Sequence, residues 1–234
     1  REKADQKWLG ICLGDQAAVY TDQGKSQKAL KLYKEEESLC NELNDMEGVI
    51  RSIGNQALAL EKAGNLSEAL ERYESKEQLC RSMGDTAKIV SVLGNRIRIL
   101  NATGRHKEAL GVLKKQEQTF RQMVNKVELQ DCLGTQGNVL KKLGYTTAAA
   151  SVFSEAEEIC ETLENNEGLV VHLGNHAALI LDSNGSTEEA VKLAERSVEL
   201  CKIHHLEDLE KQVVPILEEA RAKMQGSSSE QRDQ

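Results

Sequence analysis

Residues 53–70, IGNQALALEKAGNLSEAL, determine the fold of this chain. Before Gly64, the apolar side chains Ile53, Ala57 and Leu60 recur at the spacing of one face of an α-helix. Glycine easily adopts the backbone conformation that ends a helix, and a second apolar run at helical spacing follows Gly64. The stretch therefore predicts two helices joined by a glycine turn.

The same pattern recurs every 40 residues along the chain. Each first helix contains a Leu-Gly or Ile-Gly pair, whose glycines are Gly14, Gly54, Gly94, Gly134 and Gly174. The turn glycines are Gly24, Gly64, Gly104, Gly144 and, after a one-residue insertion, Gly185, and the alanines that follow them are Ala29, Ala69, Ala109, Ala149 and Ala190. Residues suited to cap a helix precede the next repeat at Asp45, Asp85, Asn125 and Asn165. We therefore predict five helix-turn-helix repeats, at about 6–45, 46–85, 86–125, 126–165 and 166–205.

Composition supports an all-α fold and excludes several function classes. With one Pro and only 3% aromatic residues, the chain suits long helices and lacks the residues of a β-sandwich or barrel. A net charge of -8 without a long basic run argues against nucleic acid or a membrane surface as the partner. No apolar stretch approaches the roughly 18 residues that span a bilayer.

The repeat resembles the tetratricopeptide repeat (TPR) in a longer, 40-residue form. The resemblance is carried by IGNQA at 53–57 and GNLSEAL at 64–70, and it covers about residues 6–205. It implies an α-solenoid wound as a right-handed superhelix, in which the first helix of each repeat lines a concave groove. The usual proline after the second helix is absent, and Thr-Gln-Gly at 135–137 replaces the Asn-x-Ala pattern.

The C-terminal region departs from the repeat. Residues 206–224 predict an amphipathic helix that caps the last repeat, and we expect Pro215 to kink or split it. The composition of 225–234 predicts a disordered tail. The N-terminal end shows no equivalent cap and the chain opens without Met, so we expect a fragment of a larger protein with further repeats upstream.

Residues with potential chemistry do not combine into a catalytic or metal site. Four of the six cysteines, Cys40, Cys80, Cys160 and Cys201, occupy one register, and packed helices hold such positions too far apart for a disulfide. We expect six free thiols. His172 and His176 have the spacing of two metal ligands, but no third ligand is evident, and interface histidines are the alternative. We predict no enzyme, no metal and no cofactor.

The resemblance places the candidate partner-binding residues on the first helices. A polar column of Asp15, Asn55, Asn95, Thr135 and Asn175 lies beside the glycines, which would lower the groove floor. In grooves like that of the kinesin light chain, an Asn at the matching place hydrogen-bonds a peptide backbone. The alternative is that these polar groups bond neighbouring helices. The candidate residues are Arg51, Asn55, Leu58, Lys62, Asn95, Arg98, Thr135, Asn138, Lys141, Lys142 and Asn175.

Charge suggests the kind of partner. The chain does not match the carboxylate clamp of chaperone-binding TPR proteins, because Gly14 and Ala18 occupy the positions where that clamp has Lys and Asn. The central groove nevertheless carries five basic side chains (Arg51, Lys62, Arg98, Lys141 and Lys142) against two acidic ones, Glu61 and Asp131. We expect an acidic, extended peptide or loop of a partner protein, with Leu58 as an apolar contact and Lys76 outside the site on the convex face. The alternative is that the basic groups pair with neighbouring glutamates.

The sequence thus predicts a protein-interaction module within a larger intracellular, cytoplasmic protein. It binds another protein and neither nucleic acid nor membrane, and its oligomeric state is left open. The alternative function is a structural, sensor or autoinhibitory TPR array of a larger signalling or nucleotide-switched protein.

Overall fold

A computed structural model describes residues 2–230, and the side chains of 5–226. All regular structure in this part of the chain is helical, which confirms the all-α prediction. The helices are α1 (Glu2–Asp22), α2 (Ser26–Glu42), α3 (Met46–Lys62), α4 (Leu66–Ser82), α5 (Thr86–Ala102), α6 (His106–Gln122), α7 (Lys126–Lys142), α8 (Thr146–Thr162), α9 (Asn166–Asp182), α10 (Thr187–His204) and α11 (Glu207–Glu230).

The helices begin and end where the repeat pattern predicts. The side chains of the predicted caps accept hydrogen bonds from backbone N–H groups three residues later, at Asp45, Asp85, Asn125 and Asn165. The turn glycines of the first four repeats have positive φ, between 71 and 80°. In the fifth repeat, Asn184 takes the left-handed conformation with φ 52° instead of Gly185, because of the inserted residue.

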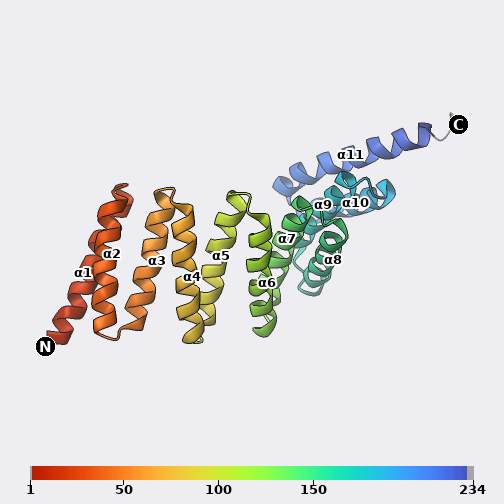
Figure 1. The fold of residues 1–234 in the computed structure, drawn as a ribbon. Helices are drawn as coiled ribbons and strands as arrows, with labels where there is room; N and C mark the ends of the chain where they lie inside the picture. The colour runs from red at the N-terminus through yellow and green to blue at the C-terminus, as the bar shows by residue number, and fades with distance from the viewer. Residues whose placement is uncertain (1, 231–234) are drawn as a thin grey trace. The chain divides into compact units, whose positions relative to one another are not determined.

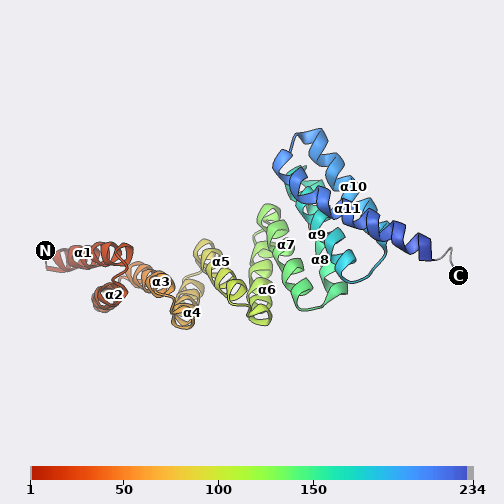
Figure 2. The ribbon, with the colours of Figure 1, turned by 90° about the horizontal axis from the view of Figure 1, so that it is seen from above.

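The chain forms two compact units, Arg1–Gly104 and Arg105–Gln234, which divide the third predicted repeat between them. In the first unit, α1 to α5 pack as antiparallel neighbours (Figure 1). Figure 2 shows α1, α3 and α5 in one row and α2 and α4 in a second row. The repeated alanines are fully buried, as Ala29 and Ala69 are in this unit, so helices approach closely there.

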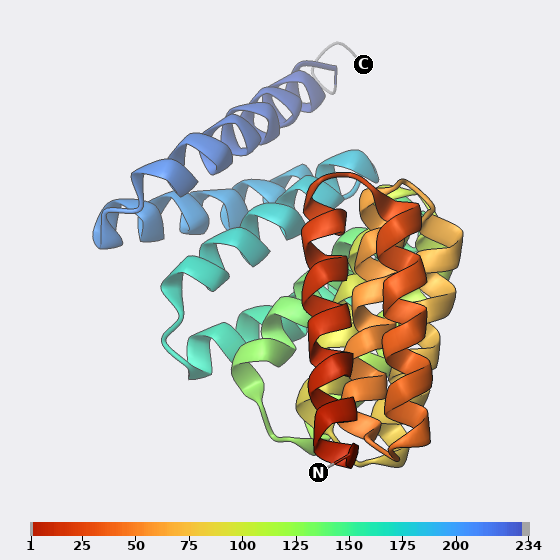
Figure 3. The ribbon, with the colours of Figure 1, turned by 90° about the vertical axis from the view of Figure 1, so that its left-hand side faces the viewer.

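The second unit holds α6 to α11. Val213, Leu217 and Ala220 of α11 are buried in one core with residues of α9 and α10, so α11 covers the end of the last repeat (Figure 3). Of the two outcomes expected at Pro215, a split is wrong, because α11 is continuous through this residue, and a kink stays a prediction. The expectation of disorder is also wrong for residues 225–230, because α11 extends to Glu230. The remaining residues of the expected tail, 231–234, lie outside the described residues.

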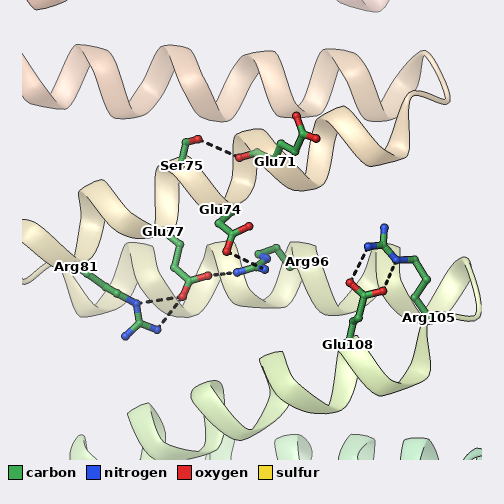
Figure 4. A network of polar contacts seen from close by, with 8 residues as sticks. All are labelled: Glu71, Glu74, Ser75, Glu77, Arg81, Arg96, Arg105 and Glu108. Atoms are coloured by element: carbon green, nitrogen blue, oxygen red, sulfur yellow. Dashed lines mark hydrogen bonds and ion pairs between the residues drawn. The ribbon is translucent and has the colours of Figure 1, made fainter.

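A polar bond at one register joins each second helix to the next first helix. In the first unit, Gln56 Nε2 donates to Glu37 Oε2 at 2.6 Å, and Arg96 pairs with Glu77. Figure 4 shows Arg96 in contact with both Glu74 and Glu77, and Arg81 in contact with the same Glu77 carboxylate. In the second unit, the equivalent bonds join Gln136 to Glu117 at 2.7 Å and His176 to Glu157 at 3.0 Å. The stacking of repeats is therefore specified by polar pairs as well as by apolar packing.

Candidate functional site

The polar column of the first unit carries unused hydrogen-bonding groups. Asn55 on α3 and Asn95 on α5 are half-buried, and neither side chain forms a hydrogen bond to any residue that the structure describes. Each amide offers two N–H donors and one carbonyl acceptor. The alternative in which these amides bond neighbouring helices therefore receives no support at these two positions.

The second unit carries a comparable but less regular set. Asn138 on α7 and Asn175 on α9 are half-buried, and their side chains have no hydrogen bond within the described part of the chain. Thr135 differs, because its hydroxyl donates to the backbone carbonyl of Asp131 at 3.0 Å. The hydroxyl proton of Thr135 is thus used inside its own helix.

Most of the basic candidates are neutralised by carboxylates. In the first unit, Arg51 pairs with Glu36 at 2.8 Å, Lys62 with Asp22 at 2.8 Å and Arg98 with Glu61 at 2.6 Å. In the second unit, Lys141 pairs with Asp182 at 2.7 Å. Only Lys142, of the five, has no ion pair among the described residues. The expected excess of positive charge is therefore absent at these side chains, and the alternative of neighbouring ion pairs describes four of them.

Of these four ion pairs, the one between Arg51 and Glu36 contains the most deeply buried carboxylate. The Glu36 side chain is fully buried, and burial raises the pKa of its carboxyl group although Arg51 opposes this. Arg51 donates from both Nε and Nη2 to the same oxygen, Oε1 of Glu36. Arg51 is therefore committed to joining α2 to α3, and its removal would leave a buried carboxylate without its counter-ion.

Four glycines of the polar column's helices, Gly14, Gly54, Gly134 and Gly174, lie against side chains and do not form an open groove floor, which corrects the expectation at these positions. A Cβ atom on Gly14 would lie 2.8 Å from Oε1 of Glu36, and one on Gly54 would lie 2.5 Å from Nζ of Lys76. In the second unit, a Cβ on Gly174 would lie 3.1 Å from Cγ1 of Val213. These glycines make room for side chains of other helices.

Lys76 is the functional candidate that sequence reasoning missed. Its side chain is half-buried over Gly54, the neighbour of Asn55, and does not lie free on a convex face. No carboxylate pairs with it in the described part of the protein, and burial lowers the pKa of its amine. The sequence carries no direct signal for this contact, because the position of Lys76 over Gly54 depends on how α4 packs on α3.

Leu58 completes the first-unit site. It is 42% exposed and lies three residues after Asn55 on α3, so the two side chains share one face of the helix. The site of the first unit, defined by Asn55, Leu58, Lys76 and Asn95, thus combines free amides, an exposed apolar group and an unpaired ammonium group.

The histidine pair of α9 has a structural setting. Nδ1 of His176 contacts Glu157, and its ring stacks on Phe153 with centroids 6.0 Å apart. His172 is 4% exposed, lies against Gly134, and has no hydrogen bond at either ring nitrogen. Burial lowers the pKa of His172.

The described residues contain neither a cluster of metal ligands nor a membrane-spanning helix. No three His, Cys, Asp or Glu side chains in this part of the chain gather as metal ligands would. No helix in it combines the length and apolar character needed to cross a bilayer.

Comparison with solved structures identifies the fold. BtubC (BKLC) from P. vanneervenii has a TM-score of 0.64 at 17% identity, over 86% of this chain and 82% of that one. A putative kinesin light chain with nearly identical TPR-like repeats from P. anserina has a TM-score of 0.64 at 16% identity, over 85% and 97%. A STAND protein with a tetratricopeptide repeat sensor from Pyrococcus horikoshii has a TM-score of 0.66 at 14% identity, over 93% of this chain and 36% of that one. No family model and no curated protein matches the sequence. The chain has the fold of TPR proteins, which confirms the predicted resemblance at the level of the fold.

Proposed function

We propose that this chain is a protein-interaction module that binds an extended, acidic segment of a partner protein. The observation that carries the proposal is the pair of half-buried amides, Asn55 and Asn95, that have no partner among the described residues. An extended peptide backbone presents alternating N–H and C=O groups, and the amide side chain can satisfy one of each. Binding would therefore supply hydrogen bonds that the isolated chain leaves unmade.

Lys76 supplies the preference for an acidic segment. Its ammonium group is half-buried and has no carboxylate partner among the described side chains, so a carboxylate that reaches it forms a charge-assisted hydrogen bond in a partly desolvated site. Arg51, Lys62 and Arg98 contribute less to this preference, because each already holds a carboxylate of the chain. Leu58 offers an apolar contact beside Asn55.

The second unit presents a second potential surface of the same type, which we include in the proposal. Asn138, Lys142 and Asn175 have no side-chain partner in the part of this unit that the structure describes, whereas Thr135 and Lys141 do. Because Lys142 is exposed, its contribution is expected to be weaker than that of the half-buried Lys76.

Selection of linear peptides from a random display library against the full chain tests this function. We expect enriched peptides to be rich in Asp and Glu and to bind about tenfold more weakly to Lys76→Gln, equivalent to ~1.4 kcal/mol. Lys34→Gln, which changes an exposed lysine of α2, is the matched control and leaves affinity unchanged. Failure to enrich acidic sequences, or equal losses in both variants, would contradict the proposal.

A second candidate function is a sensor or autoinhibitory array, which the likeness to the STAND protein's repeat sensor favours. Such an array is expected to use the outward surfaces of its second helices. The two functions are separated by the variants that abolish binding. Loss of a partner on Asn55→Ala or Asn95→Ala supports the first, whereas loss only on substitution of exposed second-helix residues such as Lys31 or Glu71 supports the second.

A further inference from the structure

One face of α1 is exposed, although the residues equivalent to most of its side chains are buried in α3 and α9. Trp8, Leu9 and Val19 have exposed fractions of 67%, 53% and 54%, and Cys12 and Gln16 on the same face are also exposed. Spaced by three, four and seven residues, these side chains form one stripe along the helix. We call this stripe the α1 face.

The residues 40 positions later show what the α1 face is built to contact. On α3, the equivalents of Leu9, Cys12, Gln16 and Val19 are 0 to 3% exposed, because α2 packs on them; they are Val49, Ser52, Gln56 and Ala59. On α9 in the second unit, the equivalents are 2 to 7% exposed beneath α8; they are Leu169, His172, His176 and Leu179. Each such face is therefore covered by a second helix.

The polar contacts at these junctions define the chemistry of the covering helix. The side chain equivalent to Gln16 always meets a glutamate of the covering helix, as Gln56 meets Glu37 and His176 meets Glu157. The side chain equivalent to Cys12 can donate to a backbone carbonyl, as Ser52 Oγ does to Tyr33 O at 2.6 Å. The α1 face offers the same donors without a covering helix in the structure.

We propose that the α1 face binds an amphipathic helix of a partner polypeptide that carries a glutamate opposite Gln16. The pattern of α8 is the best guide to that partner, with Phe153, Ala156, Glu157 and Cys160 on the packing face. A helix like α2 fits less well. Its buried Glu36 is neutralised by Arg51, and the position equivalent to Arg51 on α1 is the uncharged Ile11.

A second copy of this chain is a poor occupant for the α1 face. Within the described residues, α2, α4, α6 and α8 each pack on the first helix that follows, and α10 packs on α9 and α11. No second helix is left to cover α1 of another molecule without unfolding its own repeat. The α1 face therefore fits a helix of a partner polypeptide better than a helix of a second copy.

Trp8 provides the readout for a binding experiment, because it is the only tryptophan of the chain. At the equivalent position of α3, a Cβ on Gly48 would point at the sulfur of Cys40 on the covering helix, so Trp8 points toward a docked helix. A synthetic peptide with the sequence of residues 145–163 is titrated into the full chain. We expect a saturable blue shift of Trp8 emission as the indole leaves water.

Matched variants locate the site. Val19→Asp is expected to weaken peptide binding at least about tenfold, whereas Val127→Asp on α7, whose valine is 55% exposed compared with 54% for Val19, leaves it within about twofold. A peptide with Phe153→Asp is expected not to bind. Equal weakening by the two chain variants would overturn the proposal.

A second arrangement covers the case of a peptide too short to be helical alone. The sequence 146–165 replaces residues 1–5 and is joined directly to Gln6. The junction that precedes α9, with Asn165 as its cap, then precedes the shortened α1. We expect the same blue shift and a raised urea midpoint, both cancelled by Val19→Asp. Absence of a blue shift of Trp8 emission in both arrangements would overturn the proposal. A blue-shifted Trp8 emission without any peptide, together with a doubled mass in sedimentation, would also overturn it and would assign the face to a second copy.

Discussion

Arg96 of α5 forms an ion pair with Glu77 of α4, whose side chain is only 4% exposed. Arg81, one turn along α4, contacts the same carboxylate. The neighbouring Arg98 pairs with Glu61 instead, and its own side chain is 56% exposed. Two arginines on one helix therefore serve in very different surroundings.

We expect Arg96→Ala to lower the free energy of unfolding by about 2 kcal/mol, because the buried Glu77 loses an arginine with which it forms an ion pair. Arg98→Ala, which removes an exposed ion pair, is expected to cost less than about 1 kcal/mol. Urea denaturation of both variants measures the difference. Adding Glu77→Gln to Arg96→Ala should recover part of the loss, and equal costs for the two single variants would contradict this account.

Val124 is a β-branched residue with φ 55°, in the left-handed region, at the end of α6. The same position is Asn44 in the first repeat and Gly84 in the second, both of which tolerate this conformation better. We expect Val124→Asn to raise the free energy of unfolding by about 1 kcal/mol through relief of backbone strain. A lower urea midpoint in this variant would show that Val124 is instead held by packing.

The stability of the second unit is expected to fall with acidification below the ordinary pKa of histidine. Burial lowers the pKa of His172, so the unfolded chain binds a proton that the native chain does not. The free energy of unfolding therefore decreases as pH falls from about 6.5 toward the lowered native pKa. Urea midpoints at several pH values measure this, and His172→Gln is expected to flatten the profile. An unchanged profile in that variant would contradict the assignment.

The cover formed by α11 is expected to contribute strongly to stability. Leu217 is 7% exposed in the core that α11 shares with α9 and α10. We expect Leu217→Ala to cost about 2–4 kcal/mol and to increase aggregation on heating. Ile203→Ala on α10, where the isoleucine is 60% exposed, is the control and should change stability by less than about 0.5 kcal/mol. Similar small effects of both changes would mean that α11 is only loosely attached.

Local features of the fold were predictable from the sequence because they depend on neighbouring residues. Asp45 caps α3, and Gly64 closes the turn before α4, through contacts within a few residues. The end of α11 was not predictable in this way, because the composition of 225–234 suggests disorder whereas the helix continues to Glu230. The continuity of α11 was not predictable either, because a proline inside a helix usually interrupts it and α11 continues through Pro215.

The candidate site was only partly predictable, since its side chains meet across repeats. The register placed Asn55 and Asn95 on first helices, and both amides lack partners among the residues described. The pairing of Lys62 with Asp22 and of Arg98 with Glu61 joins positions 40 and 37 residues apart, which a count of charges cannot resolve. Lys76 was missed because its position over Gly54 depends on how α4 packs on α3.

Calorimetric titration of one selected acidic peptide tests the central claim most directly. The titration compares the wild-type chain with the double variant Asn55→Ala and Asn95→Ala, at ionic strengths from about 0.05 to 0.5 M. We predict that the double variant remains folded and binds at least about tenfold more weakly, and that wild-type affinity falls as salt rises. Equal affinity of the two chains for the peptide would contradict the claim that the free amides of α3 and α5 hold the partner.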